Sequence, residues 1–166
     1  TDKAKDTVKS ALRSHPRNLL LNQYKIDLKE GKNTFNFNCK NKANVVAEIL
    51  YIASNALSSQ AIYPLSNFYL NLAKHLNKDF ISYDTLLAEN FYEIDDFDKA
   101  KKIYKDLNKK GKAFLWYSSK QLARIYIKEE NKKKALELLS VAYNNLQSKD
   151  YYETFDYAEF LKNNEK

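Results

Sequence analysis

The chain has 166 residues, of which 44% are hydrophobic and 30% charged, and it contains only two Gly and two Pro. This composition allows a buried core and disfavours both a disordered linker and a β-rich fold with many tight turns. It also excludes phosphate-binding loops, because Gly31 and Gly111 stand too far apart to form one, and no apolar run is long enough to insert into a membrane.

The formal net charge is +7, and it arises mainly from lysines spread along the chain. Lysine-rich helix faces are ordinarily solvated, so we interpret the charge first as compositional and leave open a functional basic surface. The single cysteine, Cys39, excludes a disulfide within the chain and a cysteine-based zinc site.

Residues 1–30 have the pattern of two helices that form part of a repeat. Apolar residues at helical spacing predict helices over 4–12 and 17–30, and Gly31 is expected to end the second with a left-handed backbone. These two helices are taken as one partial repeat.

Residues 31–42 are predicted to interrupt the helical array as an irregular or extended connector. Apolar and polar residues alternate over 33–38, which is typical of an extended segment laid along a surface. Our hypothesis is that Phe35 and Phe37 pack into the junction between the two helical blocks.

Residues 43–166 contain an internal repeat that is marked by small side chains. Four small residues recur at separations of 34, 35 and 35 positions, and each is followed three residues later by a bulky apolar one. The small residues are Ser54, Ala88, Ala123 and Ala158. Two helices approach closely only where one offers a small group and the other a ring or leucine, so we expect these positions to be buried between helices.

A second series of small residues follows each of the first three about a dozen positions later and indicates a second helix in each repeat. Its members are Ser66, Ala100 and Ala135, each succeeded four residues later by a larger apolar residue. The sequence therefore predicts helical hairpins, with helices over 43–58, 63–76, 81–94, 97–109, 114–129, 132–147 and 151–162.

This pattern resembles the tetratricopeptide repeat family. The segments that carry the resemblance are Leu87-Ala88, Phe91, Ala100 and Tyr104, and a second copy with Leu122-Ala123, Tyr126, Ala135 and Leu139. The usual early Trp and terminal Pro are missing from both copies. The resemblance covers residues 47–162 and implies an all-α solenoid of helix-turn-helix units, as an internal fragment of a longer bacterial multi-repeat protein.

The resemblance also implies a protein-binding scaffold whose first helices line a concave face. Carried over residue by residue, the partner-binding positions are expected to be Tyr51, Asn55, Glu89, Tyr92, Tyr117, Lys120, Gln121, Arg124, Lys128, Tyr152 and Phe155. Lys120, Arg124 and Lys128 follow each other at i+4 spacing, so we expect them to receive an acidic segment of a partner protein or peptide.

A pentatricopeptide-like module that binds single-stranded RNA is the alternative function. It also repeats every 35 residues, and Tyr83-Asp84-Thr85-Leu86-Leu87 resembles the start of one such unit. The next repeat lacks that opening, so nucleic acid is the less favoured partner. Self-association of the stack is left open.

No residue pattern indicates an enzyme, a metal site or a cofactor. His15 and His75 lack the neighbours that a catalytic pair or a metal site requires, and the acidic pairs at 95–96 and 129–130 fall at turns where capping explains them. The compartment stays undetermined between bacterial cytoplasm and periplasm.

Overall fold

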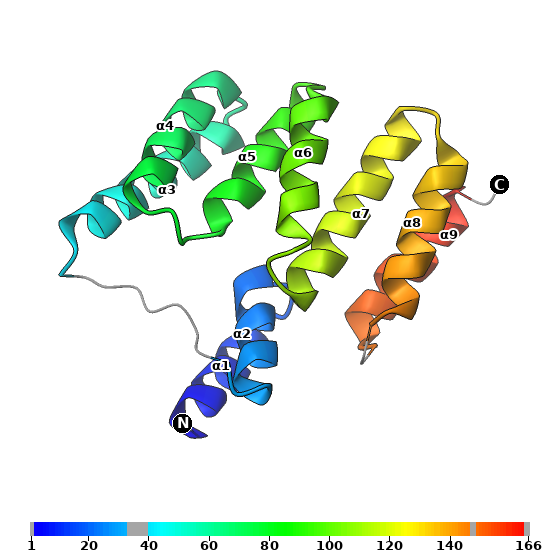
Figure 1. Ribbon diagram of the computed structural model, residues 1–166, viewed down its shortest axis with the longest axis horizontal. Helices are drawn as coiled ribbons and strands as arrows, with labels where there is room; N and C mark the ends of the chain where they lie inside the picture. The colour runs from blue at the N-terminus through cyan, green and yellow to red at the C-terminus, as the bar shows by residue number, and fades with distance from the viewer. Residues whose placement is uncertain (1, 33–39, 147–148, 165–166) are drawn as a thin grey trace. The chain divides into compact units, whose positions relative to one another are not determined.

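The computed structural model describes residues 2–32, 40–146 and 149–164, and every regular element within these ranges is an α-helix (Figure 1). The helices are α1 (Asp2–Ser14), α2 (Leu19–Lys29), α3 (Lys42–Ser59), α4 (Tyr63–Leu76), α5 (Ser82–Glu93), α6 (Phe97–Leu107), α7 (Lys112–Lys128), α8 (Lys132–Asn144) and α9 (Tyr151–Asn164). Their ends lie within three residues of the predicted ones. The predicted all-α fold class is confirmed, whereas the alternating segment with Phe35 and Phe37 lies outside the described residues.

Polar side chains fix the starts of several helices. Asn18, Asn41 and Asn131 each accept a hydrogen bond from a backbone N–H in the first turn of α2, α3 and α8. At α9, Asp150 accepts from the N–H groups of residues 152 and 153, and the Glu153 carboxylate accepts from the Asp150 N–H. This reciprocal arrangement satisfies amides that a helix start leaves unpaired.

The turns inside three successive hairpins share one backbone feature. Ala61, Asp95 and Glu130 have φ values of 60°, 57° and 59°, and they lie between α3 and α4, α5 and α6, and α7 and α8. Such left-handed conformations are uncommon outside glycine. Their spacing matches the 34- and 35-residue spacing of the small residues, so the backbone repeats with the sequence. The predicted left-handed Gly31, which follows α2, is also present, with φ 70°.

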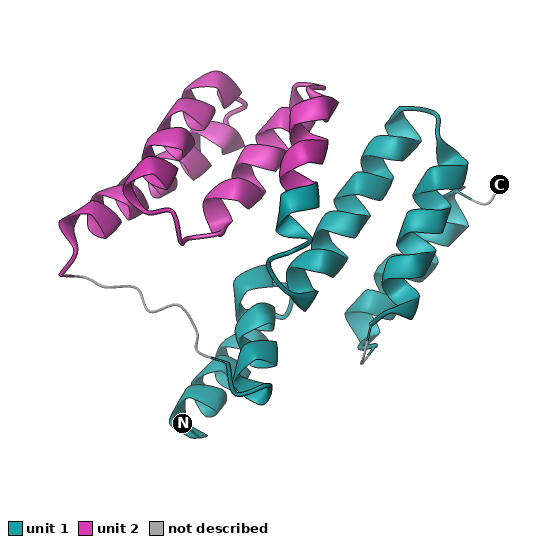
Figure 2. Cartoon of the chain, in the orientation of Figure 1, with its two compact units in different colours: residues 1–34, 105–166 teal, residues 35–104 magenta. Residues whose placement is uncertain are grey.

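The chain forms two compact units, and residues 35–104 make up unit 2 (Figure 2). Its helices α3 and α4 form a hairpin, and α5 packs against both of them. The core is built around small and bulky residues in contact: Ala47, Leu70, Ala73, Tyr83, Leu86 and Leu87. Ser54 and Ala88 are fully buried, as predicted.

A buried amide links the helices of unit 2. The Asn90 side chain of α5 donates to Ser66 Oγ and to Asn67 Oδ1, each at 2.8 Å, and accepts from Ser58 Oγ at 2.6 Å. Ser66 in turn donates to the Ser54 carbonyl at 2.9 Å. Because buried polar groups are costly without partners, this network selects one register of α5 against the α3–α4 hairpin.

Unit 1 combines residues 1–34 with residues 105–166 (Figure 2). It contains the α1–α2 hairpin, the α7–α8 hairpin and α9, and α2 packs against α7 although about 80 residues separate them in sequence. Ala123 and Ala135 are fully buried, as predicted. The larger core residues of the α7–α8 hairpin are Phe114, Trp116, Leu122, Ile125, Tyr126 and Leu139.

The fourth small residue, Ala158, corrects the sequence interpretation. Its predicted burial is wrong, because it is exposed on α9. Ala88 and Ala123 are covered within complete hairpins, whereas no described helix follows α9 to form a hairpin with it. A small residue at the repeat position is therefore buried only where the second helix of the hairpin is present.

Candidate functional site

The predicted partner-binding residues of α3 divide into one packed and one exposed side chain. The Tyr51 ring contacts the rings of Phe80 and Tyr83 edge-on, with centroids 5.6 and 5.4 Å away, and burial raises the pKa of its hydroxyl. Asn55 is exposed, and its amide donates to the Tyr51 carbonyl at 2.9 Å. Tyr51 therefore packs α3 against α5 and the residue segment before it, and Asn55 remains accessible.

The α5 residues Glu89 and Tyr92 behave similarly. Glu89 is exposed, whereas Tyr92 is half-buried and its ring lies 5.8 Å from that of Phe97 at the start of α6. Of the four unit 2 residues predicted to bind a partner, Tyr51 and Tyr92 thus have rings that pack against neighbouring helices, and Asn55 and Glu89 carry exposed polar groups.

On α7, the cationic residues expected to receive an acidic segment differ in their surroundings. Lys120 is half-buried, forms an ion pair with Asp156 of α9 and lies 5.7 Å from the centroid of the Trp116 ring. Arg124 is exposed and donates to Gln121 at 2.8 Å, and Lys128 is exposed. Tyr117 is half-buried. Since an acid of the same unit already neutralises Lys120, an incoming acidic segment would have to compete for it.

The α9 residues Tyr152 and Phe155 are both exposed, and they lie in an aromatic group together with Tyr151. The Arg17 guanidinium lies 5.2 Å from the centroid of the Tyr152 ring and donates to Asp156 at 2.8 Å. Asp156 of α9 thus forms ion pairs with Arg17, in the turn before α2, and with Lys120 of α7. These pairs connect that turn to α7 and α9. Exposed rings beside an arginine have the composition of protein-binding hot spots.

Helix α2 contacts α7 through residues that the sequence analysis did not identify. Gln23 is the one buried residue of α2, and its Oε1 accepts from the Ala113 N–H at 3.0 Å. Glu30 forms ion pairs with Lys112 and Lys32, and hydrogen bonds from these lysines lower the pKa of its carboxyl to about 2. The one sequence signal was Gly111, where the absence of a side chain allows Gln23 to approach.

Most of the large hydrophobic side chains that are exposed in the described ranges lie on the α3–α4 hairpin of unit 2. Ile52, Ile49 and Phe68 are 66%, 60% and 56% exposed. We define the α3–α4 apolar face by the exposed residues Val45, Val46, Ile49 and Ile52 of α3 and Leu65, Phe68, Leu72 and Leu76 of α4. On each helix these residues recur every three to four positions, so they form a stripe along one side.

This face lies on a different side of the hairpin from α5. Ser58 of α3 and Asn67 of α4 bind Asn90 of α5, and Lys74 of α4 binds Asp84 of α5. These three residues lie on a different side of their helices from the exposed stripes. The hairpin therefore has two apolar sides, of which α5 covers one. In the sequence this face corresponds to a second apolar stripe on α4, formed by Leu65, Phe68, Leu72 and Leu76, in addition to the stripe that contains the small residues.

No group of three or more His, Cys, Asp or Glu side chains in the described ranges comes together in a way that could hold a metal ion. Among the helices that the structure describes, none has both the length and the apolar character to cross a membrane.

Comparisons with protein-family models and with curated proteins gave no match to this chain. The fold and the exposed surfaces define its class: an all-α protein built from helical hairpins, with an apolar face on one hairpin that no described residue covers.

Proposed function

We propose that the chain is a protein-binding scaffold of the tetratricopeptide repeat type, belonging to a longer bacterial multi-repeat protein. The repeat of small residues, and the left-handed turn residues Ala61, Asp95 and Glu130 at the same period, support the assignment to this type. Scaffolds of stacked hairpins bind their partners through surfaces that several helices share.

The observation that carries the proposal is the α3–α4 apolar face. Monomeric proteins rarely expose large contiguous apolar surfaces, and those that do generally use them to bind proteins or membranes. Covering Ile49, Ile52 or Phe68 would contribute about 1 kcal/mol for each side chain, since each is roughly half exposed. Several such contributions suffice for a specific interface.

The partner that fits this face is an amphipathic helix or helical hairpin. An amphipathic helix with apolar residues at the same spacing of three to four would pack its ridges against the exposed stripe of α3 or of α4. In unit 2, α5 already packs against the other side of the same hairpin. The exposed α9 rings Tyr152 and Phe155 offer a second contact for a partner segment.

Single-stranded RNA is the alternative partner, and one observation favours it. The exposed rings of Tyr151, Tyr152 and Phe155 lie beside Arg17, and aromatic rings with cations are the usual platform for unpaired bases. However, Asp156 neutralises Arg17, the cation that lies over the Tyr152 ring, and also Lys120 of α7. The aliphatic α3–α4 face offers no ring other than Phe68 for stacking. Both features favour protein over RNA.

The test uses the full chain with a photo-cross-linking residue in place of Ile52, expressed in bacteria. A second bait also carries Ile49→Asp and Phe68→Asp, and a third carries Val141→Asp, which alters an exposed apolar residue of α8. Circular dichroism must show that all three baits are folded. We expect the first and third baits to cross-link the same protein and the second to lose it.

The partner identified by cross-linking is then purified without the cross-link, and its affinity for the native chain and for each variant is measured. We expect Ile49→Asp with Phe68→Asp to weaken it at least tenfold, and Val141→Asp to leave it unchanged. Equal cross-linking and equal affinity for all baits would exclude the α3–α4 face as the binding surface. Loss of the signal after ribonuclease treatment would favour RNA, and a cross-linked product of two identical chains would identify self-association.

A further inference from the structure

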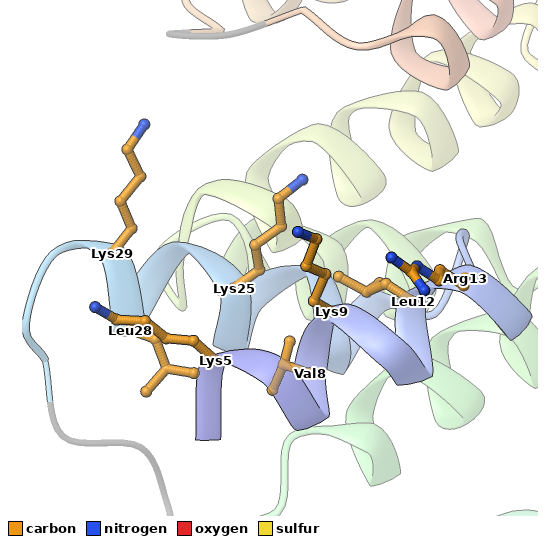
Figure 3. Close-up of a pocket in the computed structure, with 8 residues that line it drawn as sticks. All are labelled: Lys5, Val8, Lys9, Leu12, Arg13, Lys25, Leu28 and Lys29. Carbon is orange, nitrogen blue, oxygen red and sulfur yellow. The ribbon is translucent and has the colours of Figure 1, made fainter. Parts of the chain in front are cut away.

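Helices α1 and α2 of unit 1 enclose a groove that is separate from the surfaces described above. It has a volume of about 620 Å3 and combines an aliphatic floor with a cationic rim (Figure 3). We define the α1–α2 groove by the floor residues Val8, Leu12 and Leu28 and the rim residues Lys5, Lys9, Arg13, Lys25 and Lys29.

The floor of the groove is not buried by the fold. Val8, Leu12 and Leu28 are half-buried, and α1 contributes no buried residue. The apolar stripe of α1 therefore packs against α2 and remains partly in contact with water. A ligand with an apolar side would remove this surface from water and would hold α1 more firmly against α2.

The rim places positive charge along both sides of the floor. Lys5, Lys9 and Arg13 follow each other at i+4 spacing on α1, so their attachment points extend over about 12 Å. Lys25 and Lys29 have the same spacing on α2 and project from one side of that helix (Figure 3). Of these five rim residues, Lys5 forms an ion pair with Asp2 at 3.8 Å, and Lys25 lies within the electrostatic range of Glu153 of α9. The groove therefore complements a ligand with negative charge on both flanks of an apolar stripe.

We propose that the α1–α2 groove binds an acidic amphipathic helix of a partner protein. The apolar stripe of that helix would cover Val8, Leu12 and Leu28, and carboxylates on its two flanks would pair with the cations of the two rims. Such a helix matches both the apolar floor and the distribution of charge along the groove.

The chemistry of the groove distinguishes this partner from others. A fatty acid carries one carboxylate at one end, whereas five cations follow both sides of the floor. RNA needs rings or polar groups that contact its bases, and the floor is aliphatic. A membrane surface is contacted by protruding apolar side chains, whereas Val8, Leu12 and Leu28 lie recessed between the rims.

The test measures fluorescence anisotropy of a labelled synthetic peptide of about 18 residues, long enough to form a helix. It carries leucines on one face and glutamates on both flanks, and a scrambled peptide of equal composition is its control. The full chain is compared with a Lys9→Glu, Lys25→Glu variant and with a Lys102→Glu, Lys133→Glu variant. Both variants change the net charge equally, but Lys102 and Lys133 are exposed on α6 and α8.

We expect the amphipathic peptide to bind the native chain at least tenfold more tightly than the scrambled peptide does. Charge reversal in the groove should weaken that binding at least tenfold, and reversal at Lys102 and Lys133 should change it less than twofold. Raising the salt from about 0.1 M to about 1 M, which shortens the Debye length from about 10 Å to about 3 Å, should also weaken it. A Leu12→Ser variant should weaken binding at low salt, because the floor contributes apolar contact.

Several results would overturn the proposal. Equal binding of the scrambled peptide, or equal weakening by the two charge-reversal variants, would mean that attraction to the basic chain is non-specific. Tighter groove-dependent binding of oligouridine or of phosphatidylserine vesicles would assign the groove to RNA or to membranes instead. The Ile49→Asp, Phe68→Asp variant should bind the peptide like the native chain. The proposal for the α1–α2 groove and the proposal for the α3–α4 apolar face are therefore tested independently of each other.

Discussion

The side-chain oxygen of Gln23 lies 2.3 Å from the position that a β-carbon would occupy at Gly111. Gly111 has φ 148°, a conformation that favours glycine, and it precedes the Ala113 N–H that donates to Gln23. We predict that Gly111→Ala displaces Gln23 and lowers the free energy of unfolding by about 2–3 kcal/mol, through backbone strain and the lost buried hydrogen bond. Urea unfolding followed by circular dichroism measures the change.

Gly31→Ala is the matched control. Gly31 also has a positive φ, of 70°, but a β-carbon there meets nothing within 4 Å. The Gly31→Ala substitution should therefore lower the free energy of unfolding by only about 1 kcal/mol, through backbone strain without a steric clash. Equal destabilisation by the two substitutions would show that the approach of Gln23 does not matter for unit 1.

Asn90→Ala should destabilise unit 2 by about 2–3 kcal/mol. The substitution removes the partner of Ser58 and the donor to Ser66 and Asn67 at a buried site, so their polar groups lose hydrogen bonds that water does not replace. Asn71→Ala is the comparison, because Asn71 is exposed and its amide bonds the carbonyl one turn earlier. Thermal unfolding of both variants tests this, and equal stability would contradict the stabilising role of the network.

Glu48→Gln should stabilise the chain at pH 7. Burial raises the pKa of the Glu48 carboxyl above its usual 4.5, and the interaction with the Tyr83 hydroxyl offsets only part of that rise. The folded state therefore binds this proton more tightly than the unfolded state, and stability falls as the pH rises from about 4.5 through the raised pKa. Gln removes the buried charge.

The stabilisation by Glu48→Gln should be present at pH 7 and disappear near pH 3, about 1.5 pH units below the usual pKa of 4.5, where the carboxyl is protonated in both states. Urea unfolding at the two pH values measures it, with Glu93→Gln, at an exposed position of α5, as the reference. The same gain at both pH values would show that the effect is not electrostatic.

Asp156→Asn should loosen α2 from α7 and α9. The substitution removes the charge that pairs with Arg17 and Lys120. Both pairs are partly exposed, so we expect a loss of roughly 1 kcal/mol and about fivefold faster amide hydrogen exchange in α2. Exchange within unit 2 should not change, and Glu159→Gln on the same helix should leave α2 as in the native chain. Unchanged exchange in α2 would mean that the ion pairs of Asp156 do not stabilise the packing of α2 and that its apolar contacts with α7 suffice.

The hairpins could be predicted from the sequence because they depend on local periodicity. Ser54, Ala88 and Ala123 recur with a fixed partner three residues later, and the requirement for close helix contact translates that spacing directly into structure. Helix ends were also predictable, since Asn18, Asn41 and Asn131 are capping residues with a local mechanism.

The contact of α2 with α7 could not be predicted in this way. It joins residues about 90 positions apart, such as Gln23 and Ala113, and no periodicity specifies which helix a stripe will cover. For the same reason, the sequence placed Tyr51 on a binding face, whereas its ring packs against Phe80 and Tyr83. Ala158 illustrates the limit of the repeat pattern, which identifies a position but not whether another helix covers it.

The division of unit 1 between both ends of the chain has a consequence for folding during synthesis. Unit 2 is one continuous stretch, residues 35–104, and its contacts are available as soon as that stretch leaves the ribosome. The α1–α2 hairpin is synthesised before α7, so Gln23 and Glu30 find their partners Ala113 and Lys112 only after about 80 further residues have been made. Unit 1 therefore completes its packing only after all of unit 2 has been synthesised, and during that interval the apolar stripes of α1 and α2 are accessible to chaperones.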